Sequence, residues 1–294
     1  MPSQTIAQTD IQKRFAKFNY IADDKLATAL QLVMALQKPL LIEGPAGVGK
    51  TASAKVLADV LGTKLIRLQC YEGLDTSTAL YEWNYPKQIL HIRLSEGSGK
   101  TVAEREADIF SDAFMLKRPL LEAISETDQA PVLLIDEIDR ADEEFEAFLL
   151  ELLGEFQITI PELGTLKAQH RPYVILTSNR IRDLSDALRR RCLYLWQDYP
   201  SFEKEIEILK THLPQIDERL AEQIAEVMVR LRDYHFNKVP GVAESLDWAR
   251  SLVALHKGQL DMDIIEQTLG VILKDQEDWE LFEHHKDDLE VLAS

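Results

Sequence analysis

A glycine-rich segment near the start of the chain has the residue types and spacing that bind phosphate groups. It matches the pattern G-x-x-x-x-G-K-[ST], and its members are Gly44, Pro45, Ala46, Gly47, Val48, Gly49, Lys50 and Thr51. Glycines allow backbone N–H groups to converge on a phosphate, which also meets the positive end of the following helix. Lys50 would neutralise the β- and γ-phosphates, and the Thr51 hydroxyl would ligate Mg²⁺. The segment predicts a site for a nucleoside triphosphate.

Two adjacent carboxylates, Asp136 and Glu137, follow the continuous apolar run Val132–Ile135. Such runs are typical of strands covered on both faces, and α/β sheets bind ligands at the carboxyl ends of their strands. Asp136 would hold the Mg²⁺ shell, usually through water, and Glu137 would polarise the attacking water. An exposed acidic turn is the alternative, but the glycine-rich segment upstream favours the catalytic interpretation. The two motifs together predict hydrolysis of the nucleotide.

The elements around these motifs predict an α/β domain with a largely parallel sheet. Leu40–Glu43 reads as a strand, and a helix is expected from about Lys50 to Leu61, ended by Gly62. Leu65–Leu68 and Tyr173–Leu176 read as two further strands. Strands that alternate with helices in this way indicate parallel pairing.

Two β-hairpins are expected as insertions in this domain. The first covers Tyr81–Ile92, with Pro86 near its turn, and the second covers Phe156–Lys167. In the first, Tyr81, Trp83 and Tyr85 share one face at a period of two. An aromatic hairpin tip could grip a partner protein, but we favour the simpler hypothesis that these rings cover the core beneath them.

Composition and charge restrict the class of protein. Among the 294 residues, 46% are hydrophobic, which suffices for one large domain or two modest ones. No apolar run reaches the roughly 20 residues that span a bilayer, and the first residues lack the pattern of a signal peptide. The two cysteines, Cys70 and Cys192, lie far apart without metal-type spacing, which indicates buried thiols in a reducing, cytoplasmic setting.

The net charge of −17 is unevenly distributed. From Pro200 onward the chain has 21 acidic and 10 basic residues, a net charge of −11, and it is expected to be wholly helical. We therefore predict two domains, an α/β nucleotide-binding core over 1–199 and a helical domain over 200–294. An acidic surface repels phosphate backbones, so the charge argues against nucleic-acid binding.

These motifs resemble those of the AAA+ ATPases. The resemblance rests on the glycine-rich segment, the acidic cluster Asp136–Asp139 and the strand end Thr177–Asn179. The two expected hairpins resemble those of the MoxR family. The segment Leu-Ile-Asp-Glu-Ile-Asp-Arg, followed by Phe-Gln-Ile-Thr-Ile-Pro-Glu-Leu-Gly, looks closest to the CoxD-like branch. The resemblance implies a P-loop AAA+ core with two inserted hairpins, followed by a small all-helical lid.

The resemblance also implies roles for individual residues. Asn179 would be sensor 1, which positions the attacking water. The arginine offered to a neighbouring subunit's γ-phosphate would be Arg191, with Arg190 and Arg189 as alternatives. In the lid, the position where many relatives have a sensor 2 arginine holds Asp247. Arg250 lies one turn later and could substitute for that arginine, or it could be an ordinary surface residue.

By the same resemblance, the chain would form a homo-oligomeric ring, a hexamer, that binds ATP and Mg²⁺ and remodels a protein client. MoxR relatives typically work with a separate von Willebrand factor A-domain protein, and CoxD-like members are tied to the maturation of metalloenzymes, especially molybdenum hydroxylases. No nucleic acid or membrane partner is expected. Two alternatives are a nucleic-acid motor or loader, and a nucleotide-regulated switch that scarcely hydrolyses ATP. The presence of Glu137 and Asn179 argues against the switch.

Overall fold

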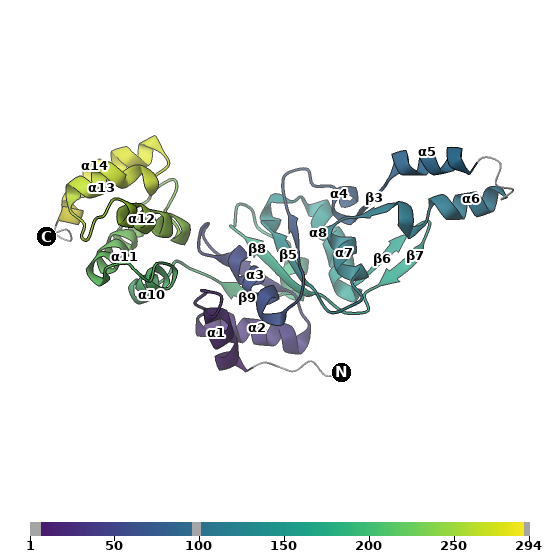
Figure 1. Cartoon of the computed structure of the whole chain (residues 1–294), viewed down its shortest axis with the longest axis horizontal. Coiled ribbons are helices and arrows are strands. Elements are labelled where there is room, and N and C mark those ends of the chain that lie inside the picture. The colour runs from purple at the N-terminus through teal and green to yellow at the C-terminus, as the bar shows by residue number, and fades with distance from the viewer. Residues whose placement is uncertain (1–6, 96–100, 291–294) are drawn as a thin grey trace. The chain divides into compact units, whose positions relative to one another are not determined.

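The computed structural model describes residues 7–95 and 101–290 (Figure 1). The chain divides into two compact units. The first, which we call the sheet unit, contains Lys25–Glu43 and Ala54–Leu195. The second, which we call the helical unit, contains Thr9–Asp24, Gly44–Ser53 and the residues from Trp196 onward.

A five-stranded sheet is the centre of the sheet unit. Its strands run in the order β2-β5-β8-β1-β9, and their bounds are β1 Leu40–Glu43, β2 Leu65–Gln69, β5 Val132–Asp136, β8 Tyr173–Ser178 and β9 Leu193–Trp196. The pairs β2–β5, β5–β8 and β1–β8 are parallel. The α/β fold with a parallel sheet is confirmed. Because these strands are parallel and neighbours, the residues that follow β1, β5 and β8 leave the sheet at one edge.

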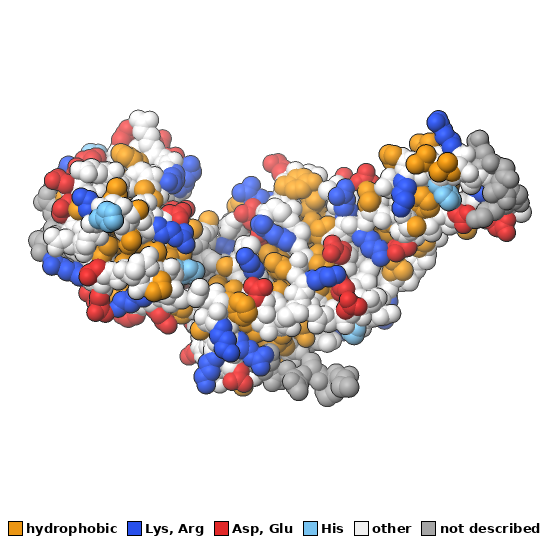
Figure 2. All heavy atoms as spheres, viewed as in Figure 1, with side chains coloured by type: hydrophobic (Ala, Val, Ile, Leu, Met, Phe, Trp, Pro, Cys, Tyr) orange, Lys and Arg blue, Asp and Glu red, His pale blue; other side chains and the backbone are white. Residues whose placement is uncertain are grey.

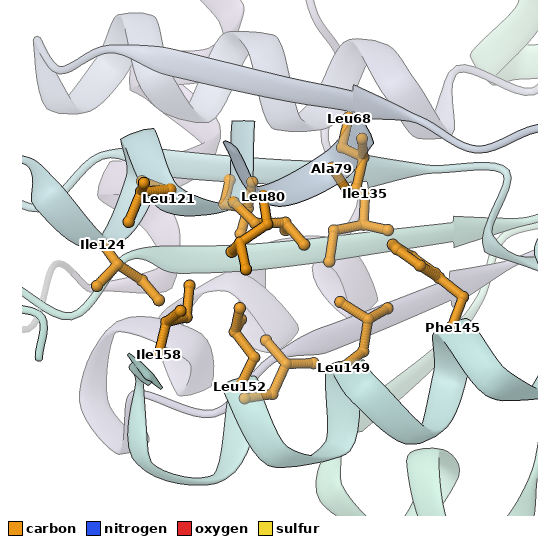
Figure 3. Packing of buried hydrophobic residues seen from close by; sticks show 14 of the residues in the cluster. Leu68, Ala79, Leu80, Leu121, Ile124, Ile135, Phe145, Leu149, Leu152 and Ile158 are labelled. Carbon is orange, nitrogen blue, oxygen red and sulfur yellow. The ribbon is translucent and has the colours of Figure 1, made fainter. Parts of the chain in front are cut away.

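Helices cover this sheet and supply its apolar core. They are α2 Asp24–Leu36, α3 Lys50–Leu61, α7 Pro119–Ser125, α8 Glu143–Glu155 and α9 Asp186–Arg191, with a 3₁₀ turn η2 Ile138–Arg140 after β5. Figure 3 shows Phe145, Leu149 and Leu152 on one face of α8, pointing toward Ile135 of β5. The expected helix from Lys50 to Leu61, followed by Gly62 at a positive φ of 64°, is confirmed.

The first expected hairpin, over Tyr81–Ile92, was wrong. Only β3, Tyr81–Trp83, is a strand, and it pairs antiparallel with β4, Met115–Lys117. Residues Tyr85–Leu94 form helix α5, because Asn84 caps the backbone N–H of Lys87 and proline is favoured in the first helical turn. Four further helical elements surround this ribbon: α4 Thr76–Leu80, α6 Val102–Ile109, η1 Asp112–Phe114 and α7, given above.

The three aromatic residues Tyr81, Trp83 and Tyr85 do not lie on one common face. Trp83 is buried and Tyr81 packs against the core of the sheet unit, whereas Tyr85 on α5 is 59% exposed. The hypothesis that these rings cover the core therefore holds for the two strand residues and fails for Tyr85.

The second expected hairpin is confirmed. Its strands, β6 Gln157–Ile160 and β7 Gly164–Lys167, pair antiparallel with Thr159 opposite Thr165. Gly164 adopts a positive φ of 80°, a conformation that glycine reaches without steric cost. Ile158 and Ile160 point into the core of the sheet unit, so the hairpin is anchored at one face.

The helical unit contains α1 Gln8–Ala16, α10 Phe202–His212, α11 Glu218–Asp233, α12 Val242–Ala254, α13 Met262–Thr268, the 3₁₀ turn η3 Leu269–Val271 and α14 Gln276–Glu290. Trp248 is the largest fully buried side chain of its core, and the Trp248 indole donates a hydrogen bond of 2.8 Å to the Thr268 hydroxyl. Across the described residues, no helix has both the length and the apolar character to cross a membrane.

Candidate active site

The glycine-rich segment directly continues β1 and belongs to the helical unit. The Lys50 ammonium donates hydrogen bonds to the carbonyl oxygens of Gly44, at 2.7 Å, and Pro45, at 2.5 Å. Gly47 and Gly49 have positive φ values of 78° and 91°, which glycine tolerates best. A Cβ atom at Gly44 would lie 1.9 Å from the Gln197 carbonyl oxygen, so only glycine fits there. The segment is a loop whose backbone must approach its neighbours closely.

Two residues that the sequence did not point to hold the far end of this loop. The Gln197 amide donates to the Val48 carbonyl oxygen at 2.7 Å, and the Tyr20 hydroxyl donates to the Gly49 carbonyl oxygen at 3.3 Å. Burial raises the pKa of Tyr20 well above its usual value, so the phenol stays protonated as a donor. Both residues lie far from the loop in sequence, and no local pattern marks them.

The start of helix α12 contacts the loop within the helical unit. The Val242 N–H donates to the Gly47 carbonyl oxygen at 2.9 Å. A Cβ atom at Gly241 would lie 2.7 Å from Gly47 Cα, so the two glycines permit a close backbone approach. The Glu244 carboxylate caps the Gly241 N–H at 2.9 Å. The loop and the first turn of α12 therefore form one packed contact.

Asp136 ends strand β5 and is buried in the sheet unit. Its Oδ1 accepts a hydrogen bond of 2.5 Å from the Thr177 hydroxyl on β8. Its Oδ2 accepts from Arg67 on β2, at 3.0 Å from Nε and 2.6 Å from Nη2. The neighbouring strands thus fix both carboxylate oxygens.

Glu137 follows immediately in a left-handed conformation, with φ 55°. The Thr177 hydroxyl accepts a hydrogen bond of 2.9 Å from the Glu137 N–H, which fixes this turn. The Glu137 carboxylate then meets three side chains: Arg140 Nε at 2.7 Å, Gln69 Nε2 at 3.1 Å and Asn179 Nδ2 at 3.5 Å. The structure thus brings together Asp136, Glu137 and Asn179.

Asp139 anchors the loop that carries Asn179. Its buried Oδ2 accepts hydrogen bonds from the backbone N–H groups of Asn179, at 3.0 Å, and Ile181, at 2.8 Å. The members of the acidic cluster therefore have different roles. Asp139 is structural, whereas the Glu137 carboxylate belongs to a group of polar side chains at the carboxyl ends of the strands. A carboxylate held beside an amide in this way can orient a water molecule for attack.

The three consecutive arginines of α9 have different environments. Arg189 Nη2 lies 3.2 Å from Oε1 of Glu43, a buried carboxylate at the end of β1. Arg191 Nη1 donates to the Leu150 carbonyl oxygen at 2.7 Å. Arg190 is exposed and, as far as the described residues go, forms no ion pair. Arg189 and Arg191 thus both have partners within their own chain.

We predict that Arg189→Ala lowers thermal stability, whereas Arg190→Ala does not. Removing Arg189 leaves the Glu43 carboxylate buried without its cation, which costs about 3–5 kcal/mol for a fully buried pair and less here because Arg189 is partly exposed. Arg190 is a matched exposed control on the same helix. The melting temperatures of the two variants check this, and equal values would contradict a structural role for Arg189.

Arg250 lies on α12 and forms an ion pair of 3.0 Å with Asp247, one turn away. Its charge also contributes, after burial, to a lowered pKa of His212 on α10. The residue that occupies the usual sensor 2 position and its expected substitute are therefore partners of each other.

Both cysteines are poor nucleophiles in the folded chain. Burial raises the pKa of Cys70 to about 12, with a further contribution from the nearby Asp136, Asp139 and Glu137 charges. Burial alone raises the pKa of Cys192 to about 12. Because the thiolate is the reactive form, neither side chain is suited to covalent catalysis.

A parallel sheet with a glycine-rich loop after β1 and two adjacent carboxylates at the end of β5 defines a P-loop nucleotide hydrolase. A family model described as the ATPase family associated with various cellular activities (AAA) matches residues 40–195, which is more than half of the chain. The chain belongs to this family. It is therefore an ATP-binding enzyme that hydrolyses ATP, and members of the family usually bind ATP with Mg²⁺.

The chain is also similar to individual proteins. An uncharacterised protein of Staphylococcus aureus (strain bovine RF122 / ET3-1) is 27% identical over 80% of this chain and 82% of its own length. The gas vesicle ATPase GvpN of Haloferax mediterranei is also 27% identical, over 71% of this chain and 60% of its own. Among solved structures, a point mutant of RuvB from Thermotoga maritima superposes with a TM-score of 0.51 at 20% identity, covering 90% of this chain and 70% of that one. This last similarity shows the fold alone.

Proposed function

We propose that the chain is a MoxR-type AAA+ ATPase of the CoxD-like branch, an ATP-driven remodeller of proteins. In this proposal it acts in the maturation or activation of a metalloenzyme of the molybdenum hydroxylase type, together with a separate von Willebrand factor A-domain protein. The hairpin β6–β7, which lies between Glu137 and Asn179 in the chain, supports the family assignment. The insertion after β2 does not support it, because that insertion is largely helical and lacks the hairpin on which the resemblance rested.

In the proposed site, Lys50 neutralises the β- and γ-phosphates, and backbone N–H groups of the glycine-rich loop hold them. Thr51 and Asp136 are the proposed ligands of Mg²⁺, directly or through water. Their oxygen donors suit this ion. Among the described residues there is no group of three His, Cys, Asp or Glu side chains placed to hold a metal. This fits an ion that uses few carboxylates and binds largely through phosphate oxygens and water.

The remaining roles follow from the polar group at the sheet edge. Glu137 polarises the attacking water, and Asn179 orients it. Arg191 or Arg190 stabilises the transition state in a neighbouring subunit of a ring, which we propose to be a hexamer because AAA+ proteins typically form hexameric rings. Arg250 remains the proposed sensor 2 substitute. We keep the division into a nucleotide-binding core over 1–199 and a helical lid over 200–294 as a proposal.

The observation that supports a protein partner is the exposed apolar surface of helix α5. Ile89, Leu90 and Leu94 are 53%, 57% and 77% exposed, and Figure 2 shows hydrophobic side chains gathered over this helix. Contiguous exposed apolar surface is typical of sites that another protein covers. Nucleic-acid sites are instead strongly basic, and the net charge of −17 disfavours them.

The test is affinity capture with Glu137→Gln, which is expected to bind ATP and stall before hydrolysis. We expect ATP-dependent recovery of a von Willebrand factor A-domain protein or a molybdenum hydroxylase subunit. Lys50→Ala is the matched control, because it lacks the phosphate-binding ammonium and should recover neither protein. A second variant, Glu137→Gln with Ile89→Ser and Leu90→Ser, should lose the partner while it still binds ATP.

Recovery of nucleic acid alone would contradict the proposal and favour the alternative, a nucleic-acid motor or loader. DNA-stimulated hydrolysis by the wild-type chain would point the same way. Such binding would weaken steeply as salt rises, because it depends on neutralised phosphates.

A further inference from the structure

Arg67 occupies the outward oxygen of the carboxylate that the proposed function assigns to Mg²⁺. The buried Oδ1 of Asp136 accepts from the Thr177 hydroxyl, so Oδ2 is the oxygen that faces away from β8. Both Nε and Nη2 of Arg67 donate hydrogen bonds to Oδ2, at 3.0 Å and 2.6 Å. A metal-bound water that donates a hydrogen bond to Oδ2 would therefore have to displace the Arg67 guanidinium.

The same guanidinium is linked to the catalytic carboxylate. Arg67 Nη2 donates to Gln69 Oε1 at 2.5 Å, and Gln69 Nε2 donates to Glu137 Oε2 at 3.1 Å. Arg67 and Gln69 are two residues apart on β2 and share one face of this edge strand. Asp136 and Glu137 are thus joined by a chain of hydrogen bonds through β2.

The two partners of the Arg67–Asp136 ion pair differ in their exposure to solvent. The Arg67 side chain is 51% exposed, whereas that of Asp136 is 3% exposed. The Arg67 guanidinium can turn into water at little cost to itself, because its side chain is already half exposed. Asp136 cannot lose a cationic partner without replacement, because a buried, uncompensated carboxylate is strongly unfavourable. The arrangement suits an exchange of one cation for another.

We propose that Arg67 is a latch, a positioning residue that holds Asp136 when no divalent cation is bound and leaves it when one binds. Because Arg67 also holds Gln69, its departure frees the side chain that contacts Glu137. This proposal rests on the assignment of Asp136 to Mg²⁺ in the proposed function.

The test is the Mg²⁺ dependence of binding of a fluorescent, non-hydrolysable ATP analogue. In Arg67→Met, the Mg²⁺ concentration at half-saturation should fall about tenfold, the effect expected for removing a competing charge-assisted hydrogen bond. Binding of the analogue in EDTA should change less than about twofold, because Arg67 is assigned no phosphate contact. Arg67→Lys should shift the Mg²⁺ dependence less, since it keeps the charge but lacks the planar fork.

Arg118→Met is the control for loss of an exposed arginine, because Arg118 forms an ion pair of the same length, 2.6 Å, with the exposed Glu82. Its Mg²⁺ dependence should equal that of the wild type. An unchanged or higher Mg²⁺ requirement in Arg67→Met would overturn the latch. If Arg67→Met does not fold, the Arg67→Lys titration decides in the same way.

Asp136→Asn separates the latch from the proposed function. If Asp136→Asn raises the Mg²⁺ requirement while Arg67→Met leaves it unchanged, the latch is wrong and the site assignment stands. If both variants leave it unchanged, the assignment of Asp136 is wrong, and the latch is wrong with it.

Discussion

Replacing Glu137 by glutamine is expected to slow ATP hydrolysis by about 10²–10⁴-fold, the usual contribution of a positioned general base. In the structure the carboxylate is held by Arg140 at 2.7 Å and Gln69 at 3.1 Å. Glutamine has nearly the same shape but cannot accept a proton from water. Phosphate release under saturating Mg-ATP measures the loss, and the ATP dissociation constant should change only a few-fold.

Glu144→Gln is a suitable control for this variant. Glu144 is an exposed residue in the first turn of α8, close in sequence to the site but outside the polar group around Glu137. Its hydrolysis rate should equal that of the wild type. A Glu137→Gln enzyme with more than about a tenth of wild-type activity would mean that another group activates the water.

The local parts of the candidate nucleotide site were predictable from the sequence. The loop Gly44–Thr51, the strand before it and the helix after it are consecutive residues, so one motif specifies all three. Asp136 and Glu137 follow a strand whose continuous apolar character is itself a signal of the sheet centre. Asn179 follows the neighbouring strand, and parallel pairing then brings it to the same edge.

The residues that support the site were not predictable, because their partners are distant in sequence. Arg67 pairs with Asp136 across 69 positions, and Gln197 holds Val48 across 149 positions. A lone arginine on a strand, or a lone glutamine just after one, is most often a solvated side chain, and only the folded chain shows what it faces. The pairing of β2 with β5 places Arg67 beside Asp136, and no local pattern encodes that pairing.

The wrong hairpin has a similar cause. Alternating aromatic residues predicted a strand through Tyr85, but the partner of β3 is β4, more than 30 residues later. Asn84 and Pro86 instead start a helix at once. The helix-start signals therefore outweighed an alternation of only three aromatic residues. The strand that pairs with β3 is also not adjacent to it in the chain.

Replacing Arg232 by methionine is expected to destabilise the helical unit by about 3–5 kcal/mol. Arg232 on α11 and Glu205 on α10 form a two-pronged ion pair, at 2.7 Å and 3.1 Å, and their side chains are 5% and 0% exposed. Arg232 also donates to the Pro240 carbonyl oxygen at 3.0 Å and the Ser245 hydroxyl at 3.1 Å. Methionine keeps the apolar stem but leaves Glu205 buried without a cation.

Because the chain has two units, a single unfolding midpoint could mix their transitions, so the measurement must be local. Hydrogen exchange of the α10–α12 amides in increasing urea reports the stability of the helical unit alone. Lys210→Met removes the exposed pair of Lys210 with Glu218 and should cost less than about 1 kcal/mol. The double variant Arg232→Met with Glu205→Leu should recover most of the lost stability, because it removes the unpaired charge as well. If the single variant were as stable as the double variant, the ion pair would not be what joins α10 to α11.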